Sequence, residues 1–257
     1  TINFDSNVDF KSGELVTVII TKDVKDNNNN PLSKAEVFQF IAQTANAPGI
    51  FSEAENIISN SVYRPQEVNA ADMDKDGDLD MLLLNHNPKN LPLLNETGTA
   101  ELFKQDSPEK GLRLFNQTNG KFADVTTTSG INGSELSYGL GLGISDFNED
   151  GWPDFYVSND YSVSDYLYIN NKNGKFTNKL ESSIGHTSQF SMGNDVADIN
   201  NDGLPDIYSL DMLPEDNHRQ KLLLAPDNYA KFDLNVRSGF YYQYMRNMLQ
   251  VNNGNGT

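Results

Sequence analysis

The sequence predicts an all-β protein built from repeated four-stranded antiparallel sheets, and three observations predict this fold class. A nine-residue, aspartate-rich pattern occurs three times, at residues 72–80, 146–154 and 198–206. Segments of strand length precede and follow each copy, and the apolar residues after each copy alternate with the period of a β-strand. Asn119-Gly120 and Asn173-Gly174 favour two-residue hairpins, because both turn positions need positive φ. A unit that recurs in this way indicates a repeat architecture.

Residues 1–44 differ in pattern from the rest of the chain. A β-branched run at 15–21, a cluster of turn-forming residues at 26–31 and an alternating segment at 37–41 predict strand, turn and strand. This pattern resembles the closing strands of a bacterial immunoglobulin-like domain. The alternative is an ordinary β-hairpin that leads, through a short linker at 45–49, into the next domain.

Each repeat is expected to contain three strands around its aspartate loop, and the first two repeats a fourth. The first strands are 68–71, 140–145 and 192–197, the second are 81–85, 155–159 and 207–211, the third are 112–116, 166–170 and 248–252, and the fourth are 121–126 and 175–179. Residues 50–58 resemble the outer end of one more repeat. Insertions near 88–110 and 212–239 separate the second and third strands, so we expect them to emerge at the end of the sheets opposite the aspartate loops.

The aspartate loops have the chemistry of a calcium site. Calcium takes about six to eight oxygen ligands at roughly 2.3–2.6 Å, and carboxylates at alternate positions of a tight loop can converge on one ion. The glycine at position six permits the reversal, and position seven is expected to contribute its backbone carbonyl. The predicted ligands, for about three calcium ions, are Asp72, Asp74, Asp76, Asp78 and Asp80; Asp146, Asn148, Asp150, Trp152 and Asp154; and Asp198, Asn200, Asp202, Leu204 and Asp206.

Other metals and the other common calcium loop fit these residues less well. Magnesium prefers a smaller octahedron, and the loops lack the histidine or cysteine that zinc favours. An EF-hand loop places a bidentate glutamate at position twelve, where this chain has Leu83, Val157 and Ser209. The strand-period residues that follow each loop instead indicate a β-hairpin calcium loop.

Together, the Asp-x-Asp/Asn-x-Asp-Gly-x-x-Asp loops and the Asn-Gly-x-Phe turns resemble the FG-GAP or VCBS repeats of integrin-α-type β-propellers. Residues 146–160 and 195–213 are especially similar to bacterial relatives of cartilage acidic protein, which often carry a UnbV-type domain. The resemblance covers about residues 50–257. It implies a partial β-propeller at 45–257, made of four-stranded blades with structural calcium and preceded by the end of an immunoglobulin-like sandwich at 1–44.

Composition narrows the classes of partner. Nineteen basic and 36 acidic residues give a net charge of −17, which argues against nucleic acid as a ligand. The chain has no cysteine, hence no disulfide or thiolate metal site. The apolar runs at 15–20 and 81–84 fall far short of the roughly 20 residues of a transmembrane helix. We expect the sequence to be an excerpt of a longer protein.

Three further motifs have simple structural explanations. The glycine run Gly139, Gly141 and Gly143 precedes an aspartate loop as a strand, so we expect it to serve close strand packing and not phosphate binding. His186, Ser188 and Asp195 could form a hydrolase triad on paper, but no nucleophile elbow surrounds Ser188. The aromatic segment 240–248 can bind a sugar or peptide, or pack an insertion against its own sheet.

The sequence therefore predicts a non-enzymatic, calcium-binding module that is secreted or exposed on a bacterial outer surface. Its expected role is adhesion or recognition of a protein or glycan ligand through the insertions near 88–110 and 212–239. The alternatives are the accessory propeller of a secreted enzyme that acts on polysaccharides, and a purely structural spacer.

Overall fold

The computed structural model describes residues 15–20, 25, 28–31, 36–41, 65–86, 96–161, 163–223 and 229–254. The chain divides into two compact units, Thr1–Glu55 and Asn56–Thr257. In the first unit β1 (Leu15–Ile20) pairs antiparallel with β2 (Glu36–Ile41), which confirms the predicted strand, turn and strand. The immunoglobulin-like assignment and the boundary at 44 stay predictions. The expected linker at 45–49 and the repeat fragment at 50–58 lie outside the described residues.

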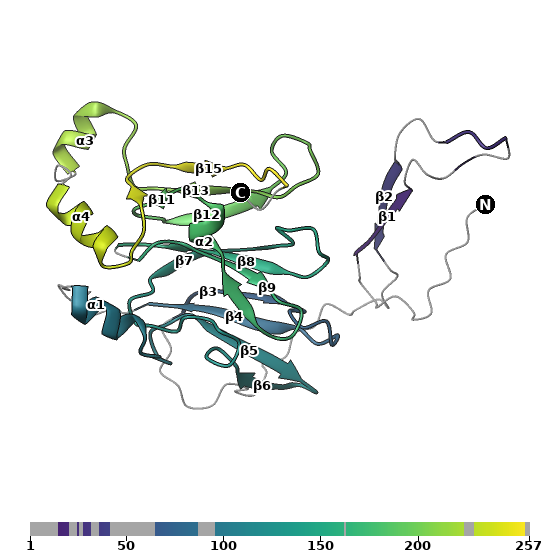
Figure 1. The fold of residues 1–257 in the computed structure, drawn as a ribbon, viewed down its shortest axis with the longest axis horizontal. Coiled ribbons are helices and arrows are strands. Elements are labelled where there is room, and N and C mark those ends of the chain that lie inside the picture. Colours follow the sequence, from purple (N-terminus) through teal and green to yellow (C-terminus); the bar gives the residue numbers. More distant parts are fainter. Residues whose placement is uncertain are drawn as a thin grey trace, which may run out of the picture. The chain divides into compact units, whose positions relative to one another are not determined.

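The second unit contains three antiparallel sheets, one for each aspartate loop (Figure 1). Their strands, in order across each sheet, are β3 (Pro65–Ala71), β4 (Asp80–Asn85), β5 (Arg113–Thr118) and β6 (Lys121–Asp124); β7 (Gly139–Ser145), β8 (Asp154–Asn159), β9 (Tyr166–Asn170) and β10 (Phe176–Asn178); and β12 (Gly193–Ala197), β13 (Asp206–Leu210) and β15 (Met248–Gln250). The all-β class and the four-stranded unit are therefore confirmed. A small parallel pair, β11 (Thr187–Ser188) with β14 (Gln243–Tyr244), was not predicted.

The prediction aligned the third strand of the first repeat incorrectly with the third strand of the second repeat. We expected it to end at residue 116, aligned with the strand that ends at Asn170, but it continues to Thr118. Thr118 pairs directly with Lys121 across the Asn-Gly turn, whereas the hairpin of the second repeat closes farther out, with Asn170 opposite Phe176. The shorter hairpin makes Gln117 the counterpart of Asn170.

The sheets stack face to face, as successive propeller blades do, and two apolar cores fill the spaces between them (Figure 1). Phe155 and Val157 of β8 belong to the core shared with the first sheet, and Tyr156 to the core shared with the third. Every residue of β8 is buried. The middle sheet is therefore covered on both faces, and its central strand carries three consecutive apolar residues, 155–157, because side chains alternate between two buried faces.

The glycine run lies where the first strands of neighbouring sheets approach closely. A Cβ atom on Gly143 would lie 2.5 Å from Cγ2 of Val196, and one on Gly141 would lie 2.7 Å from the Cα of Gly193. Both distances are too short for any side chain. The interpretation of this run as close strand packing is confirmed.

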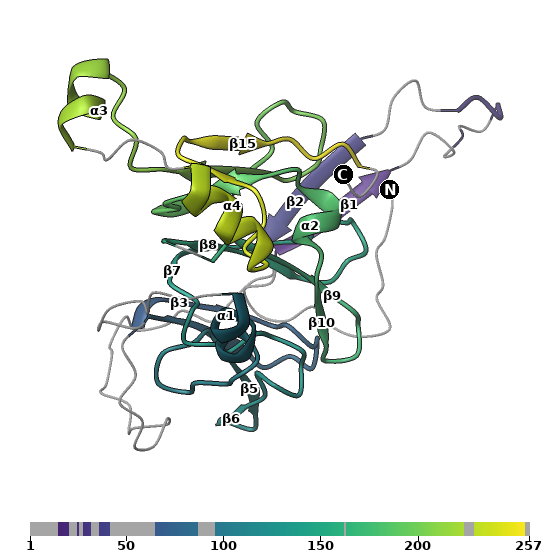
Figure 2. The same ribbon diagram turned by 60° about the vertical axis from the view of Figure 1, so that its left-hand side comes forward.

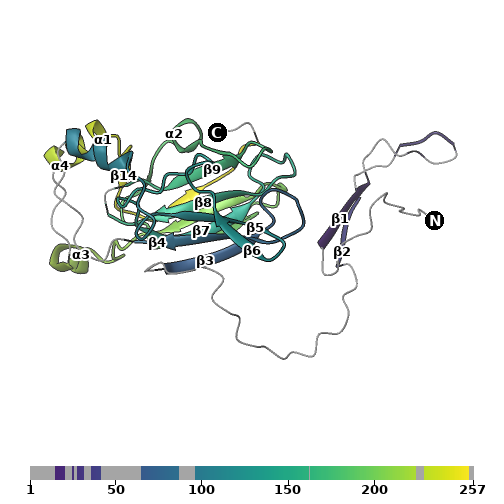
Figure 3. The same ribbon diagram turned by 90° about the horizontal axis from the view of Figure 1, so that it is seen from below.

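The helices of the insertions gather at one end of the stacked sheets. They are α1 (Glu96–Phe103), α3 (Asn217–Leu223) and α4 (Tyr229–Arg237), and Figures 1 and 3 show all three at the end opposite the loops that join the first and second strands. Figure 2 brings this end forward. The short α2 (Leu180–Ser183) contacts β9 and lies away from α3 and α4 in Figure 1. The predicted separation of insertions from aspartate loops is confirmed. No helix in the described ranges combines the length and the apolar character needed to cross a membrane.

Candidate metal centre

All three aspartate loops adopt one hydrogen-bonded conformation. The carboxylate at position one accepts the N–H of the glycine at position six, at 3.1, 2.6 and 2.9 Å in the three loops. The side chain at position three accepts the N–H of position five, and the carboxylate at position five accepts the N–H of position seven. These bonds turn the oxygen-bearing side chains back onto their own loop, as a cation site requires.

The backbone reversal depends on left-handed residues at positions four and six. The glycines at position six have φ of 99°, 86° and 92°, and position four, occupied by Lys75, Glu149 and Asn201, has φ of 59°, 56° and 61°. Glycine adopts this region without steric cost, whereas other residues adopt it uncommonly. The predicted role of the glycine is confirmed.

The carboxylate at position nine holds the loop to two strands. One of its oxygens accepts the N–H of position two, at 2.9–3.0 Å in all three loops. The other accepts an N–H from the third strand, at 2.9 Å for Asp80, 2.7 Å for Asp154 and 2.9 Å for Asp206. Each of these carboxylates is almost fully buried. Burial raises the pKa of Asp154 to about 6, and it also raises the pKa of Asp80.

The first loop brings together the oxygens of Asp72, Asp74 and Asp80, one from each lying within 4.8 Å of the others. The side-chain amide of Asn116 donates to Asp74 at 2.7 Å and to Asp80 at 3.2 Å, so a positively polarised group already lies between these carboxylates. Asp78 behaves differently, because its carboxylate caps the N–H of Asn119 in the adjacent hairpin. This leaves its backbone carbonyl for the loop, as expected at position seven.

In the second and third loops, asparagine at position three reduces the negative charge. Asn148 and Asn200 each donate to the carboxylate at position five, at 3.0 and 2.9 Å. Lys172 adds an ion pair with Asp150 at 3.3 Å. The ring of Trp152 at position seven lies beneath the ammonium of Lys75 from the neighbouring loop, 5.0 Å from the ring centroid. Oxygen is the donor type at every predicted ligand position, which fits a hard divalent cation such as calcium.

Sequence reasoning missed a set of side-chain amides that fix the loops from the third strand. Gln117, Asn170 and Asn252 each donate to the carbonyl of position eight in their own loop, at 3.1, 3.1 and 3.4 Å. Asn170 also donates to the carbonyl of Met73, and Asn252 to that of Phe147, both at 2.8 Å. These carbonyls belong to the preceding loop, so consecutive loops are linked. The available signal was an asparagine three residues before each of the Asn-Gly pairs at 173–174 and 255–256.

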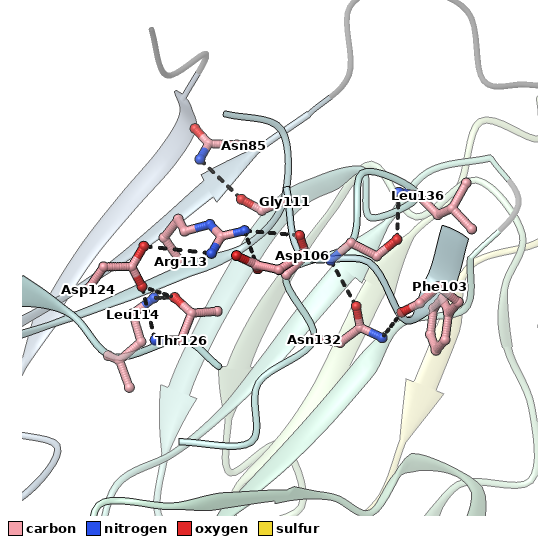
Figure 4. Close-up of polar contacts among 12 residues, drawn as sticks. Asn85, Phe103, Asp106, Gly111, Arg113, Leu114, Asp124, Thr126, Asn132 and Leu136 are labelled. Atoms are coloured by element: carbon pink, nitrogen blue, oxygen red, sulfur yellow. Dashed lines mark hydrogen bonds and ion pairs between the residues drawn. The ribbon is translucent and has the colours of Figure 1, made fainter. Parts of the chain in front are cut away.

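At the opposite end, a buried arginine anchors the first insertion to its sheet (Figure 4). The guanidinium of Arg113 lies 2.6 Å from the carboxylate of Asp106 and 3.6 Å from that of Asp124. It also donates to the carbonyl of Gly133 at 3.0 Å. The Arg113 side chain is 1% exposed, whereas both carboxylates are about a third exposed. The insertion is therefore held by one buried cation that reaches partly hydrated anions.

The same end contains a buried carboxyl group, Asp165, between the second and third sheets. It accepts hydrogen bonds from the hydroxyl of Tyr156 at 2.5 Å, the N–H of Asn159 at 2.8 Å and the hydroxyl of Ser191 at 2.8 Å. Burial raises the pKa of Asp165 to about 7, and the negative charge of Asp211 adds to the shift.

The three residues considered as a hydrolase triad have other partners in the structure. Ser188 donates to Asp211 at 2.5 Å, His186 faces Arg246, and Asp195 accepts the N–H of its own neighbour Val196. Part of the aromatic segment packs against the sheets, and the binding role considered for it stays a prediction. Phe240 is buried and the Tyr241 hydroxyl donates to the Ile184 carbonyl at 2.8 Å, whereas Tyr242 and Tyr244 are exposed.

Comparison with known proteins agrees with this geometry. Residues 146–209, from the second aspartate loop through the third and into β13, match the family model of the FG-GAP-like repeat. The chain contains FG-GAP-like repeats. Integrin alpha-6 of Gallus gallus is 29% identical over 127 residues, which cover 45% of this chain and 11% of the integrin. The chain thus spans about a tenth of the length of that relative. The predicted family of integrin-type repeats is confirmed, and the similarity to bacterial relatives of cartilage acidic protein stays a prediction.

Proposed function

We propose that this chain is a calcium-binding recognition module of a secreted or surface-exposed protein, with calcium in a structural role. The observation that carries the proposal is the common conformation of the three aspartate loops. Three separate sequences hold their oxygen-bearing side chains in the same hydrogen-bonded arrangement, at the positions expected of calcium ligands. A single loop of this kind is an ordinary turn as often as it is an ion site. Three copies with the same spacing support a common role in binding a cation.

The carboxylates of each loop lie close together, so the stability of the loop depends on compensation of their negative charge. Positions one, three, five and nine concentrate carboxylates, and position nine keeps its carboxylate buried although burial favours its neutral form. Bound calcium would supply the compensating positive charge. Because position nine also holds the N–H groups of position two and of the third strand, the ionised site stabilises the register of three strands, and affinity becomes folding free energy.

Recognition is assigned to the opposite end, through the insertions near 88–110 and 212–239. Helices α3 and α4 expose Leu222 and Tyr229, which are 69% and 80% exposed. The integrin relative supports a protein ligand and an extracellular or surface location, and repeats of this type are typically non-catalytic. A glycan ligand, an adhesive role and a bacterial outer surface are further parts of the proposal.

Calcium binding is tested by isothermal titration of chelator-treated protein and by melting with and without calcium. Wild-type protein is expected to bind three ions and to melt at a higher temperature with calcium. The double variant Asp146→Asn and Asp150→Asn, which keeps side-chain shape and removes two charges, is expected to bind one ion fewer. The control Asp195→Asn changes an exposed aspartate outside the loops and is expected to keep the full count. A melting temperature indifferent to calcium would refute the structural role.

A further inference from the structure

The side-chain amides of Asn170 and Asn252 join consecutive aspartate loops. The amide of Asn170 donates to the carbonyl of Met73, and that of Asn252 donates to the carbonyl of Phe147, both at 2.8 Å. Met73 and Phe147 each occupy position two of the preceding loop. Each asparagine therefore belongs to one repeat and holds the loop of the repeat before it.

The same two asparagines also bind the position-nine carboxylate of their own loop. The backbone N–H of Asn170 donates to Asp154 at 2.7 Å, and that of Asn252 donates to Asp206 at 2.9 Å. A single residue at each junction thus contacts a predicted ligand of one loop and the backbone of its neighbour.

Position two completes the path between the carboxylates. The N–H of Met73 donates to Asp80 at 2.9 Å, and the N–H of Phe147 donates to Asp154 at 2.9 Å. From position nine of the third loop, a path of hydrogen bonds and single residues therefore reaches position nine of the second loop and then that of the first.

The bridge between the first two loops is buried and fully bonded. Asn170 is 2% exposed and Met73 is 3% exposed. The side-chain oxygen of Asn170 accepts the N–H of Lys172 at 2.9 Å, and its amide also donates to the carbonyl of Pro153 at 3.1 Å. Leaving a buried amide without partners is costly, so the position of Asn170 is tied to the positions of both loops.

We propose that calcium binding is positively cooperative between adjacent loops, with Asn170 coupling the first loop to the second and Asn252 coupling the second to the third. The proposal rests on the proposed calcium sites and adds their regulation. Once position nine of the second loop is fixed by a bound ion, the backbone of Asn170 is fixed with it, and its side chain then fixes position two of the first loop. The first loop therefore loses less conformational freedom when it binds its own ion. By linkage, occupancy of the first loop raises the affinity of the second by the same factor.

The charges of the loops act in the same direction. Each loop contains at least three aspartates among its predicted ligands, so a doubly charged ion leaves no loop positive. An occupied loop therefore does not repel the ion of the next loop. Salt screens this part of the coupling, and in about 1 M salt the Debye length is about 3 Å. Measurements at this salt concentration isolate the part that the hydrogen bonds carry.

Trp152 supplies a probe of the second loop. It is the only tryptophan of the chain and occupies position seven of that loop. The calcium concentration at the midpoint of its fluorescence change therefore measures the affinity of the second loop. The double variant Asp146→Asn and Asp150→Asn, which removes two predicted ligands of this loop, should abolish the change. Any change that remains in this variant is subtracted.

The first test disables one neighbouring loop at a time. Asp72→Asn with Asp76→Asn disables the first loop, and Asp198→Asn with Asp202→Asn disables the third, at equivalent positions. Either change is expected to raise the calcium midpoint of Trp152 about three- to tenfold, the range that one net hydrogen bond supplies. An unchanged midpoint in both variants would overturn the proposal.

The second test removes one bridge at a time. Asn170→Ala should cancel the effect of disabling the first loop and keep that of the third, and Asn252→Ala should do the reverse. Each variant is the control for the other: a misfolded variant loses both effects, and the remaining variant then decides. Asn171→Ala, whose side chain bonds Thr177 in the adjoining hairpin, should keep both effects. Effects that survive both bridge substitutions would overturn the coupling role of the asparagines.

The calcium count separates this proposal from the proposed function. Three bound ions by isothermal titration, with a Trp152 midpoint that does not depend on the other loops, would leave the calcium sites standing and overturn the coupling. The absence of bound ions would overturn both. Three ions together with the crossed pattern of the two asparagine variants would support both.

Discussion

Replacing Asp165 with asparagine is expected to remove a large pH-dependent penalty from the folded state. The pKa of this buried carboxyl is raised from 3.8 to about 7, a shift of about 3 units. At about 1.36 kcal/mol per unit, the ionised form costs the folded protein on the order of 4 kcal/mol above pH 7. That cost is a large fraction of the 5–15 kcal/mol by which domains are usually stable.

The direction of the pH effect follows from proton binding. Between pH 4 and pH 7 the folded state keeps the Asp165 proton that the unfolded state releases, so its contribution to stability falls as pH rises through this window. Below pH 4 both states are protonated and the penalty vanishes. Asparagine has no such proton. Its amide can serve the hydroxyls of Tyr156 and Ser191, which rotate to accept, while its oxygen still accepts the N–H of Asn159.

The assay is urea unfolding of wild type and Asp165→Asn at half-unit steps from pH 4 to pH 8, at one fixed calcium concentration. The difference between the two proteins cancels the contributions of the other carboxyl groups, Asp154 among them. It is expected to shift by on the order of 4 kcal/mol in favour of the variant from pH 4 to pH 8. A difference that stays constant with pH would show that Asp165 is ionised in the folded protein without cost, and would refute the reasoning.

Two further pairs of substitutions test packing and charge away from the loops. Gly143→Ala is expected to lower the free energy of unfolding by about 1–3 kcal/mol, because its Cβ would overlap Val196. Gly185→Ala, where nothing lies within 4 Å of the new Cβ, should stay within about 0.5 kcal/mol of wild type, as denaturant unfolding would show. Asp106→Ala leaves buried Arg113 short of its closest partner and should cost about 3 kcal/mol, whereas Arg113→Met leaves two partly hydrated carboxylates and should cost less. The reverse order would show that the carboxylates, and not the guanidinium, are the buried partners.

The sequence alone predicted the features that depend on residues close to one another along the chain. The aspartate loops, the strands beside them and the two-residue hairpin at Asn119-Gly120 each depend on local turn chemistry and on a two-residue period. The two-residue hairpin expected at Asn173-Gly174 is wrong, because Asn170 pairs with Phe176 and the positive φ angles lie at Lys172 and Gly174. The glycine run was interpreted correctly for a related reason, since glycines at every second position leave one strand face without side chains. The helices of the insertions were not predicted, because residues 96–103 and 217–237 lack a sustained helical period.

The missed parts of the site depend on contacts between distant segments. Asn170 reaches a carbonyl 97 residues earlier, and Asn252 reaches one 105 residues earlier. Asp165 owes its raised pKa to burial between two sheets and to the negative charge of Asp211, which lies far along the chain, whereas the hydrogen bond from Ser191 lowers this pKa. In sequence these residues are indistinguishable from turn asparagines and surface aspartates. The register error at residues 112–116 has the same origin, because hairpin length is set by pairing and not by the Asn-Gly motif alone.

The hydrogen bonds around position nine also explain why the insertions occur only at the helix end. Asp80 and Asp154 each use both carboxylate oxygens to bind the start of their own loop and the third strand. Asn170 then links that strand to the preceding loop. A residue added to a loop would pull at least one of these bonds out of register. The connection between the second and third strands emerges at the other end and carries none of them, so it can lengthen by a whole helix without disturbing the loops. Variation in length is therefore confined to the end that presents α1, α3 and α4, which is the end to which we assign recognition.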